Sequence, residues 1–259
     1  MVDMNVLWVF AHPEPRSLSG TLRADGARVL RELGHEVRTT DLYAMRWNPV
    51  VDRADFAAAE GERLIVGDAS ERAHCGGSLS PDIRTQQDEL RWADAVVLQF
   101  PLWWYGMPAI LKGWFDRVFV KGFAYGVRDP GTRRTRRYGD GLLRGTRALA
   151  VVTAGAPEPS IGPRGVNGDI EQLLFPLLHG TLFYTGMDVL PPFVVSGADR
   201  MSDDGCAAAS ERLTERLRTL ATAAPIPFRP QDGGDYDDDL VLRPEVVPGG
   251  SGLGVHVRR

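Results

Sequence analysis

Short, nearly continuous apolar runs that alternate with segments of helical periodicity constrain the fold of this chain more than any other feature. Such runs are typical of strands buried on both faces of a parallel sheet. The alternation places helices on both faces of that sheet, and the sequence therefore predicts an α/β fold with a five-stranded parallel sheet in the order 2-1-3-4-5. The predicted strands span residues 5–11, 36–43, 94–101, 147–153 and 188–195, and the predicted helices span residues 18–33, 81–92, 108–118, 170–181 and 202–221.

Local signals mark several ends of these elements. Gly34 stops the first helix, Pro81 suits the first turn of the second, and Ser202 caps the last. We expect Pro176 to break the helix over 170–181, and two prolines interrupt the fifth strand. Residues 44–80 contain small, charged and Gly-rich stretches, and we predict an irregular excursion there.

Composition and charge exclude several classes of protein. The chain has 259 residues, of which 43% are apolar and 25% charged, and its net charge of −4 gives no basic field for nucleic acid. The start of the chain lacks a basic segment, and the apolar run from Val6 to Ala11 is too short for a typical secretory signal or a membrane span. Cys75 and Cys206 lack metal-type spacing, and as free thiols they favour a cytoplasmic location.

The character of the chain changes after Ala224. Prolines precede an acidic stretch over 232–239, and a Gly-rich end follows. This tail is too polar and interrupted to form its own core, so it is either disordered or wraps over a partner. We therefore divide the chain into a ligand-binding domain, residues 1–224, and a C-terminal arm, residues 225–259.

The loop after the first strand contains groups that bind phosphate. Residues 12–20 offer hydroxyl side chains and backbone N–H groups at a predicted helix N-terminus, which is a natural phosphate seat. The spacing matches neither the Gly-rich dinucleotide fingerprint nor a P-loop. An equally favoured alternative is that Ser17 or Ser19 only caps the helix. His12 is either a phosphate ligand or a structural residue.

The loops after the third and fourth strands carry flat and small side chains. Trp103, Trp104 and Tyr105 cannot all face a core, so some lie on a surface that favours a planar ligand or a partner protein. Residues 153–156 are small, so their backbone amides can approach the carbonyl edge of a ring such as a flavin. When this stretch is taken alone, a simple turn is the favoured interpretation. The three loops should meet at the carboxyl ends of the strands.

Other motifs give weaker signals. No two histidines have the spacing of metal ligands, and no nucleophile elbow is present, so we predict no metal site. A Gly- and Arg-rich insert spans residues 126–146. A solvated hairpin is its favoured interpretation, and the alternative is a basic lip that attracts the phosphates of a nicotinamide donor. Its arginines are Arg128, Arg133, Arg134, Arg136 and Arg137.

At these loops the chain resembles the two-electron NAD(P)H:quinone oxidoreductase family of the DT-diaphorase type, which has a flavodoxin-like fold. The specific part of the resemblance is the block over 99–119, which contains Gln99-Phe-Pro-Leu-Trp-Trp-Tyr-Gly106 and Pro108-Ala-Ile-Leu-Lys-Gly-Trp-Phe-Asp-Arg-Val-Phe119. Weaker matches extend over nearly the whole chain, at residues 11–12, 17–22, 41–45, 48–49, 79–83, 123–125, 165–169 and 252–255.

The resemblance implies a flavin enzyme. It implies a non-covalently held FAD rather than FMN, NAD(P)H as co-substrate, and a ping-pong hydride relay to a quinone or another flat aromatic acceptor. It also implies a homodimer with active sites built across the interface, and it places Tyr125 at the border of the acceptor pocket. We predict in addition that the arm wraps the partner and that Tyr125 and Asn167 have catalytic roles. The cofactor-binding residues carried over by position are His12, Ser17, Leu18, Ser19, Pro101, Leu102, Trp103, Trp104, Tyr105, Thr153, Ala154, Gly155 and Ala156.

The chain departs from the family at positions that handle protons. In the family a Tyr and a His assist the charge on the reduced flavin, whereas Ile161 and Asn167 stand at those positions here and cannot relay a proton in the same way. A family arginine near the adenine end falls at Cys206. These departures motivate two alternatives: a tailoring reductase for one polycyclic metabolite, and a flavin-binding regulatory subunit with little turnover.

Overall fold

The central sheet is parallel and has the predicted order. The computed structural model describes residues 3–59, 61 and 63–258. Over these residues the sheet has six strands, with the order β2-β1-β3-β4-β5 confirmed and β6 also paired with β4. The strands are β1 (Asn5–Phe10), β2 (Glu36–Asp41), β3 (Ala95–Pro101), β4 (Arg147–Ala154), β5 (Asp188–Val189) and β6 (Phe193–Ser196).

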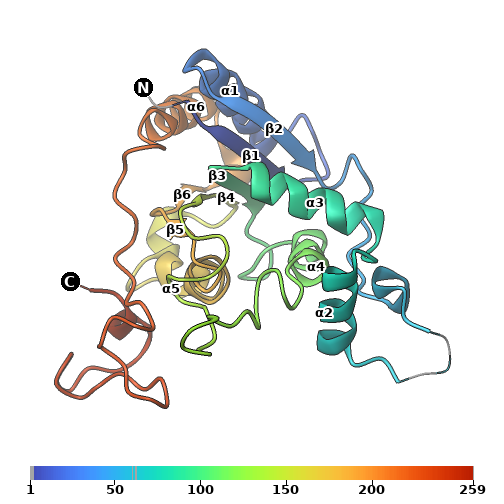
Figure 1. Ribbon diagram of the computed structural model, residues 1–259. Coiled ribbons are helices and arrows are strands. Elements are labelled where there is room, and N and C mark those ends of the chain that lie inside the picture. Colours follow the sequence, from blue (N-terminus) through green and yellow to red (C-terminus); the bar gives the residue numbers. More distant parts are fainter. Residues whose placement is uncertain (1–2, 60, 62, 259) are drawn as a thin grey trace.

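Helices cover both faces of the sheet, as Figure 1 shows. On one face Trp8 of β1 lies in a buried cluster with residues of α1 and α6, and on the other face Val9 lies in a cluster with residues of α3, α4 and α5. Alternate β1 residues therefore serve opposite layers of the core, as the period of a strand requires. The helices are α1 (Leu18–Glu32), α2 (Val66–Gly76), α3 (Pro81–Trp92), α4 (Ala109–Val118), α5 (Ile170–Leu177) and α6 (Asp203–Arg218).

Prolines interrupt two of the predicted elements, as expected. The predicted fifth strand is split into β5 and β6, because Pro191 and Pro192 between them have no N–H to donate to the sheet. The predicted break near Pro176 is confirmed, because the α-helix α5 ends at Leu177, one residue after Pro176, and the chain continues as a π-helical segment, η3 (Leu178–Phe183). The π-helical segment has a wider turn than an α-helix, and within it Thr181 donates its hydroxyl to the Pro176 carbonyl at 3.1 Å.

The excursion over 44–80 is more regular than predicted. It contains a 3₁₀ turn, η1 (Arg53–Phe56), whose first N–H groups are capped by the carboxylates of Asp52 and Asp55, and it also contains the helix α2. The buried face of α2 consists of small residues, Ala69, Ser70 and Ala73. A face without large apolar side chains gives almost no periodic signal, which is why the prediction of an irregular segment was wrong here.

The C-terminal arm packs against α5 and η3. Phe228 is buried in the core beside Phe175, His179 and Phe183. The N–H of Ile226 donates to the Val189 carbonyl at 2.7 Å, which fixes the start of the arm to the sheet. The arm of a single protomer is thus anchored on its own domain.

His179 makes the stability of the protein depend on pH. Its ring stacks on Phe175 with 4.6 Å between centroids and on Tyr138 with 5.0 Å. Burial, and after it the nearby His256, lowers the pKa of His179 from 6.5 to about 4. Since the unfolded chain is protonated below pH 6.5 while the folded chain is not, this group's contribution to stability is fully present above pH 6.5 and is lost as the pH falls toward 4.

We expect the unfolding free energy to fall by about 2 kcal/mol on this account between pH 7 and pH 4.5, a value discounted for the partial exposure of the ring. Chemical denaturation at the two pH values measures the change. His179→Phe keeps a stacked ring and removes the titration, so the fall should shrink by about the same amount. Some pH dependence should remain, because burial and then Arg229 lower the pKa of His256 as well. If both proteins lost the same unfolding free energy between pH 7 and pH 4.5, the assignment of this loss to His179 would be wrong.

Candidate functional site

Three loops at the carboxyl ends of β1, β3 and β4 line two neighbouring cavities. Their volumes are about 220 Å³ and 230 Å³, and they share Leu102 and Gly155. Every cofactor-binding residue predicted from the sequence lines one or both of them. The first cavity is lined by His12, Ser17, Leu18, Ser19, Pro101, Leu102, Trp103, Thr153, Gly155, Ala198 and Asp199, and the second by Leu102, Trp104, Tyr105, Ala154, Gly155, Ala156, Ile161, Asn167 and Leu173.

The N-terminus of α1 opens into the first cavity. Ser17 caps the helix, with its hydroxyl oxygen accepting from the Gly20 N–H at 3.2 Å. Among the described residues, the N–H groups of Leu18 and Ser19 have no acceptor. The Nδ1 atom of His12 lies 3.1 Å from both the amide and the carbonyl of Glu14, so Nε2 is the ring atom left for a ligand. Free amides at a helix N-terminus attract an anion, and the seat therefore suits phosphate.

A buried network of hydrogen bonds holds this seat against the sheet. The Trp8 indole N–H donates to Gln99 Oε1 at 2.9 Å, and Gln99 Nε2 donates to the Ser19 carbonyl at 2.7 Å. The hydroxyls of Ser19 and Thr153 lie 3.0 Å apart. All four side chains are buried, so each unmade bond would carry a desolvation cost. The network ties β1, β3 and β4 to the first turn of α1 and fixes two of the three loops.

The aromatic loop after β3 is a strained two-residue turn. Trp103 and Gly106 exchange backbone hydrogen bonds of 2.9 and 3.0 Å, and the residues between them, Trp104 and Tyr105, have φ values of 48° and 62°. This left-handed conformation normally requires Gly or Asn. It leaves the Trp104 side chain 97% exposed and Tyr105 52% exposed. Strain and exposure at two large aromatics indicate a functional surface rather than a fold requirement.

The loop after β4 presents backbone rather than side chains. Among the described residues, the N–H groups of Gly155 and Ala156 have no acceptor. A Cβ at Gly155 would lie 2.1 Å from Asp199 Oδ2, so glycine allows the loop to approach the short η4 turn (Ala198–Arg200). The two free amides are placed to donate to the carbonyl edge of a planar ring.

A chain of polar groups crosses the second cavity. The Tyr105 hydroxyl donates to Asn167 Oδ1 at 3.0 Å, and Asn167 Nδ2 donates to the Ser160 hydroxyl at 3.0 Å. Within the part of the chain described, one N–H of the Asn167 amide is then without an acceptor. Ile161 is buried in the same wall. The site thus has an amide donor at the position where the family resemblance places a histidine.

Tyr125 does not lie with the other predicted residues. It lines neither cavity, and a Cβ at Gly67, at the start of α2, would lie 3.6 Å from its hydroxyl. Sequence reasoning missed Ala198, Asp199 and Leu173. The first two follow β6, which ends one residue beyond the predicted fifth strand, so a fourth loop at the same edge of the sheet reaches the site.

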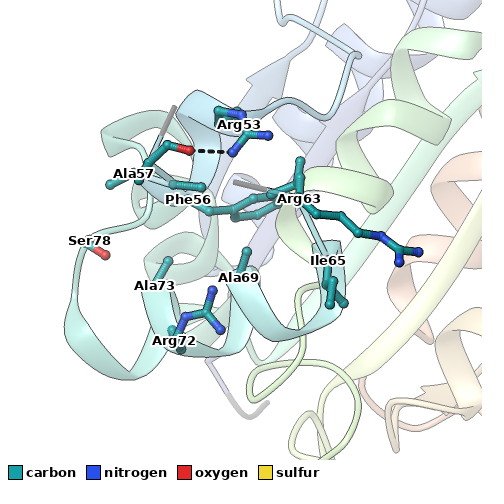
Figure 2. Close-up of a pocket in the computed structure, with 12 residues that line it drawn as sticks. Arg53, Phe56, Ala57, Arg63, Ile65, Ala69, Arg72, Ala73 and Ser78 are labelled. Carbon is teal, nitrogen blue, oxygen red and sulfur yellow. Dashed lines mark hydrogen bonds between the residues drawn. The ribbon is translucent and has the colours of Figure 1, made fainter. Parts of the chain in front are cut away.

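A separate cavity of about 280 Å³ lies beside α2 (Figure 2). Arg53 donates there to the Ala59 carbonyl at 2.6 Å, and Figure 2 shows the Arg63 side chain pointing away from Phe56. None of the predicted site residues lines this cavity. Across the described ranges, no group of three His, Cys, Asp or Glu side chains is placed to hold a metal ion. Nor does any described helix combine the length and apolarity needed to cross a membrane.

Comparisons with known proteins agree with this geometry. A family model described as a flavodoxin-like fold matches residues 4–217. The chain is 44% identical to a ribosyldihydronicotinamide dehydrogenase-like protein of Penicillium crustosum, over 98% of this chain and 96% of that one. It is 35% identical to NAD(P)H dehydrogenase [quinone] 1 of Rattus norvegicus, over 95% and 89%. A Klebsiella pneumoniae protein solved as a candidate quinone reductase superposes with a TM-score of 0.95 at 49% identity, with 99% of this chain and 100% of that chain covered.

Proposed function

The chain belongs to the flavodoxin-like NAD(P)H:quinone oxidoreductase family, and from this we propose that it is a flavin-dependent NAD(P)H oxidoreductase that delivers a hydride to a quinone or another flat aromatic acceptor. The observation that carries the proposal is the convergence of three loops on two neighbouring cavities. A bound flavin supplies the hydride chemistry, in a ping-pong relay from the nicotinamide donor to the acceptor.

The residues present fit a flavin. The free amides of Leu18 and Ser19, with His12 Nε2, would hold its phosphates in the first cavity. The free amides of Gly155 and Ala156 would donate to the carbonyls of its pyrimidine edge and stabilise negative charge there. Trp103 and its aromatic neighbours would flank the ring system and exclude water.

We propose FAD rather than FMN as the cofactor. Asp199 lines the same cavity as the amides that suit a phosphate. A carboxylate there would repel a terminal phosphate dianion, whereas it would accept hydrogen bonds from the ribose hydroxyls of an adenosine half. The family resemblance points to the same cofactor.

The second cavity is the proposed site of the acceptor. The side-chain N–H of Asn167 that has no acceptor in the described chain would donate to a carbonyl of the bound substrate. The Tyr105 hydroxyl holds that amide in place. Ile161 and Leu173 make the wall apolar and leave no side-chain proton relay at position 161. This wall favours a second candidate function, the reduction of one polycyclic aromatic metabolite.

We propose that the active unit is a homodimer. Trp104 is almost fully exposed, and Tyr125 lies away from both cavities. A second copy would cover the aromatic turn and bring its own Tyr125 to the rim of the acceptor cavity, with the arm over 225–258 wrapping the interface. The free thiols of Cys75 and Cys206 support a cytoplasmic location.

The test starts from the purified protein. Its flavin is released and identified by mass, and the holoprotein is titrated anaerobically with NADH, NADPH and dihydronicotinamide riboside. We expect FAD, bleaching of its absorbance by at least one donor, and a dimer in sedimentation. A protein that takes up neither FAD nor FMN would sink the proposal. Turnover of a polycyclic quinone far above that of a one-ring quinone would select the second candidate.

A further inference from the structure

The arginines of the insert between α4 and β4 fall into two groups. Three of them hold the insert in place. Arg134 pairs with Asp140, the Nε atom of Arg136 donates to the Asp140 carbonyl at 2.9 Å, and the Nε atom of Arg137 donates to Gln231 in the arm at 2.6 Å. These three are structural, because each is already bonded within the chain.

Arg128 and Arg133 form the second group, and both line a cavity of about 550 Å³. Across the residues that the structure describes, neither guanidinium has a hydrogen-bond acceptor or a carboxylate partner. The other two charges on the wall cancel, since Lys121 Nζ lies 2.8 Å from Glu71 Oε2; the same atom lies 3.6 Å from Oδ1 of Asp68, which does not line the cavity. The cavity wall therefore carries two uncompensated positive charges. It is formed by Glu71, Lys121, Gly122, Gly126, Val127, Arg128, Arg133 and Thr135.

The backbone of the insert is built to present these two arginines together. Arg128 and Thr135 form an antiparallel bridge, and Arg133 has a left-handed φ of 62°. Asp129 holds the turn between them, because its Oδ1 atom accepts from the amides of Gly131 and Thr132 at 3.0 and 2.8 Å. A non-glycine residue in this region is strained, and such strain concentrates at binding sites.

We propose that this cavity is a phosphate clamp in which Arg128 and Arg133 bind the diphosphate of a nicotinamide dinucleotide donor. The clamp rests on the proposed function, because it gives the phosphates of that function's donor a place. Arg128 follows Tyr125 by three residues, a span of at most about 11 Å. In the homodimer proposed above, the second copy brings its own Tyr125 to the rim of the acceptor cavity. The diphosphate of the donor lies one ribose beyond its nicotinamide ring, so the clamp of that second copy is within reach of the phosphates. Guanidinium groups match phosphate oxygens in geometry and charge.

The kinetic test uses the holoprotein and the double variant Arg128→Gln/Arg133→Gln, which keeps the side-chain length and removes both charges. We expect the ratio of kcat/KM for NADH or NADPH to that for dihydronicotinamide riboside to fall about 100-fold, about tenfold for each arginine. The riboside is the comparison because it carries no phosphate. Arg144→Gln is the matched control, since Arg144 is exposed in the same segment and does not line the cavity. Its ratio should match that of the unaltered protein.

A binding measurement separates the clamp from turnover. Inorganic pyrophosphate titrated into the holoprotein in a calorimeter should bind, with a Kd that rises at least about tenfold in the double variant and not in Arg144→Gln. An unchanged donor ratio together with unchanged pyrophosphate binding would overturn the clamp and leave the oxidoreductase standing. Absence of turnover with all three donors would instead overturn the proposed function, and the pyrophosphate titration would still decide the clamp.

Discussion

Replacement of Arg117 by methionine is expected to lower the unfolding free energy by about 3–5 kcal/mol, because it leaves a buried carboxylate without its partner. The side chains of Arg117 and Asp55 are each only 4% exposed, and Arg117 Nη2 lies 2.5 Å from Asp55 Oδ1. The Nη1 atom also bonds Asp82 Oδ2 at 2.7 Å and the Asn48 carbonyl at 3.1 Å. No neutral side chain reproduces this fork of donors.

The Arg117 cluster joins three elements that the sequence separates. Arg117 belongs to α4, Asp55 to η1, and Asp82 to the first turn of α3. Burial tends to raise the pKa of Asp82, but hydrogen bonds from Ser80 and Arg117 outweigh it and hold that pKa below its usual value. The guanidinium also lies 4.5 Å from the ring centroid of Trp47. Loss of Arg117 should therefore loosen the whole excursion over 44–80 and not α4 alone.

Chemical denaturation at pH 7 measures the effect, and two variants calibrate it. Lys112→Met removes a surface pair with Asp116 on the same helix and should change the free energy by less than about 1 kcal/mol. The double variant Asp55→Asn/Arg117→Met removes both buried charges, so it should be more stable than Arg117→Met alone. If the double variant were less stable than Arg117→Met alone, the loss of stability would come from the changed shape of the side chains and not from the uncompensated charge of Asp55.

The sheet and the loops of the site follow from the sequence because buried parallel strands leave a direct signal. The apolar runs at 5–11, 94–101 and 147–153 fix three strand ends, and parallel strands bring the loops after them to one edge. For this reason the pattern of residues is enough to group His12, Leu102 and Thr153 at one site.

Features that depend on contacts between distant segments had no such signal. The bond from Tyr105 to Asn167 joins residues 62 positions apart, and neither position suggests the other. Asp199 reaches the first cavity from the loop after β6, which pairs with β4 beyond two prolines. Phe228 looks like part of a polar tail, yet it is buried because an aromatic cluster on α5 and η3 receives it. Composition describes a segment, whereas burial depends on what packs against it.

The phosphate seat depends on a close approach of backbone that only glycine permits. Gly20 is buried in the first turn of α1, and a Cβ there would lie 1.9 Å from the Pro15 carbonyl oxygen and 2.6 Å from the carbonyl carbon. Both atoms are backbone and cannot rotate away. The loop over 12–17 therefore rests directly on the helix turn whose free amides we assign to phosphate binding.

Gly20→Ala should push that loop off the helix and displace His12 and Ser17 from the first cavity. Overpacking of this kind costs about 1–3 kcal/mol, and if that cost falls on the bound state, flavin affinity drops about 10- to 100-fold. Titration of the apoprotein with FAD, followed by flavin fluorescence, gives the Kd. Denaturation of the apoprotein gives the part of the cost that falls on folding instead.

Gly76→Ala is the matched control for Gly20→Ala. Gly76 is the last residue of α2, and a Cβ there would meet no atom within 4 Å. Alanine is the better helix former by up to about 1 kcal/mol, so this variant should be as stable as the parent or slightly more so, with unchanged flavin affinity. If Gly20→Ala bound FAD as tightly as the parent, the loop over 12–17 would not form the phosphate seat, and the assignment of the Leu18 and Ser19 amides would fail with it.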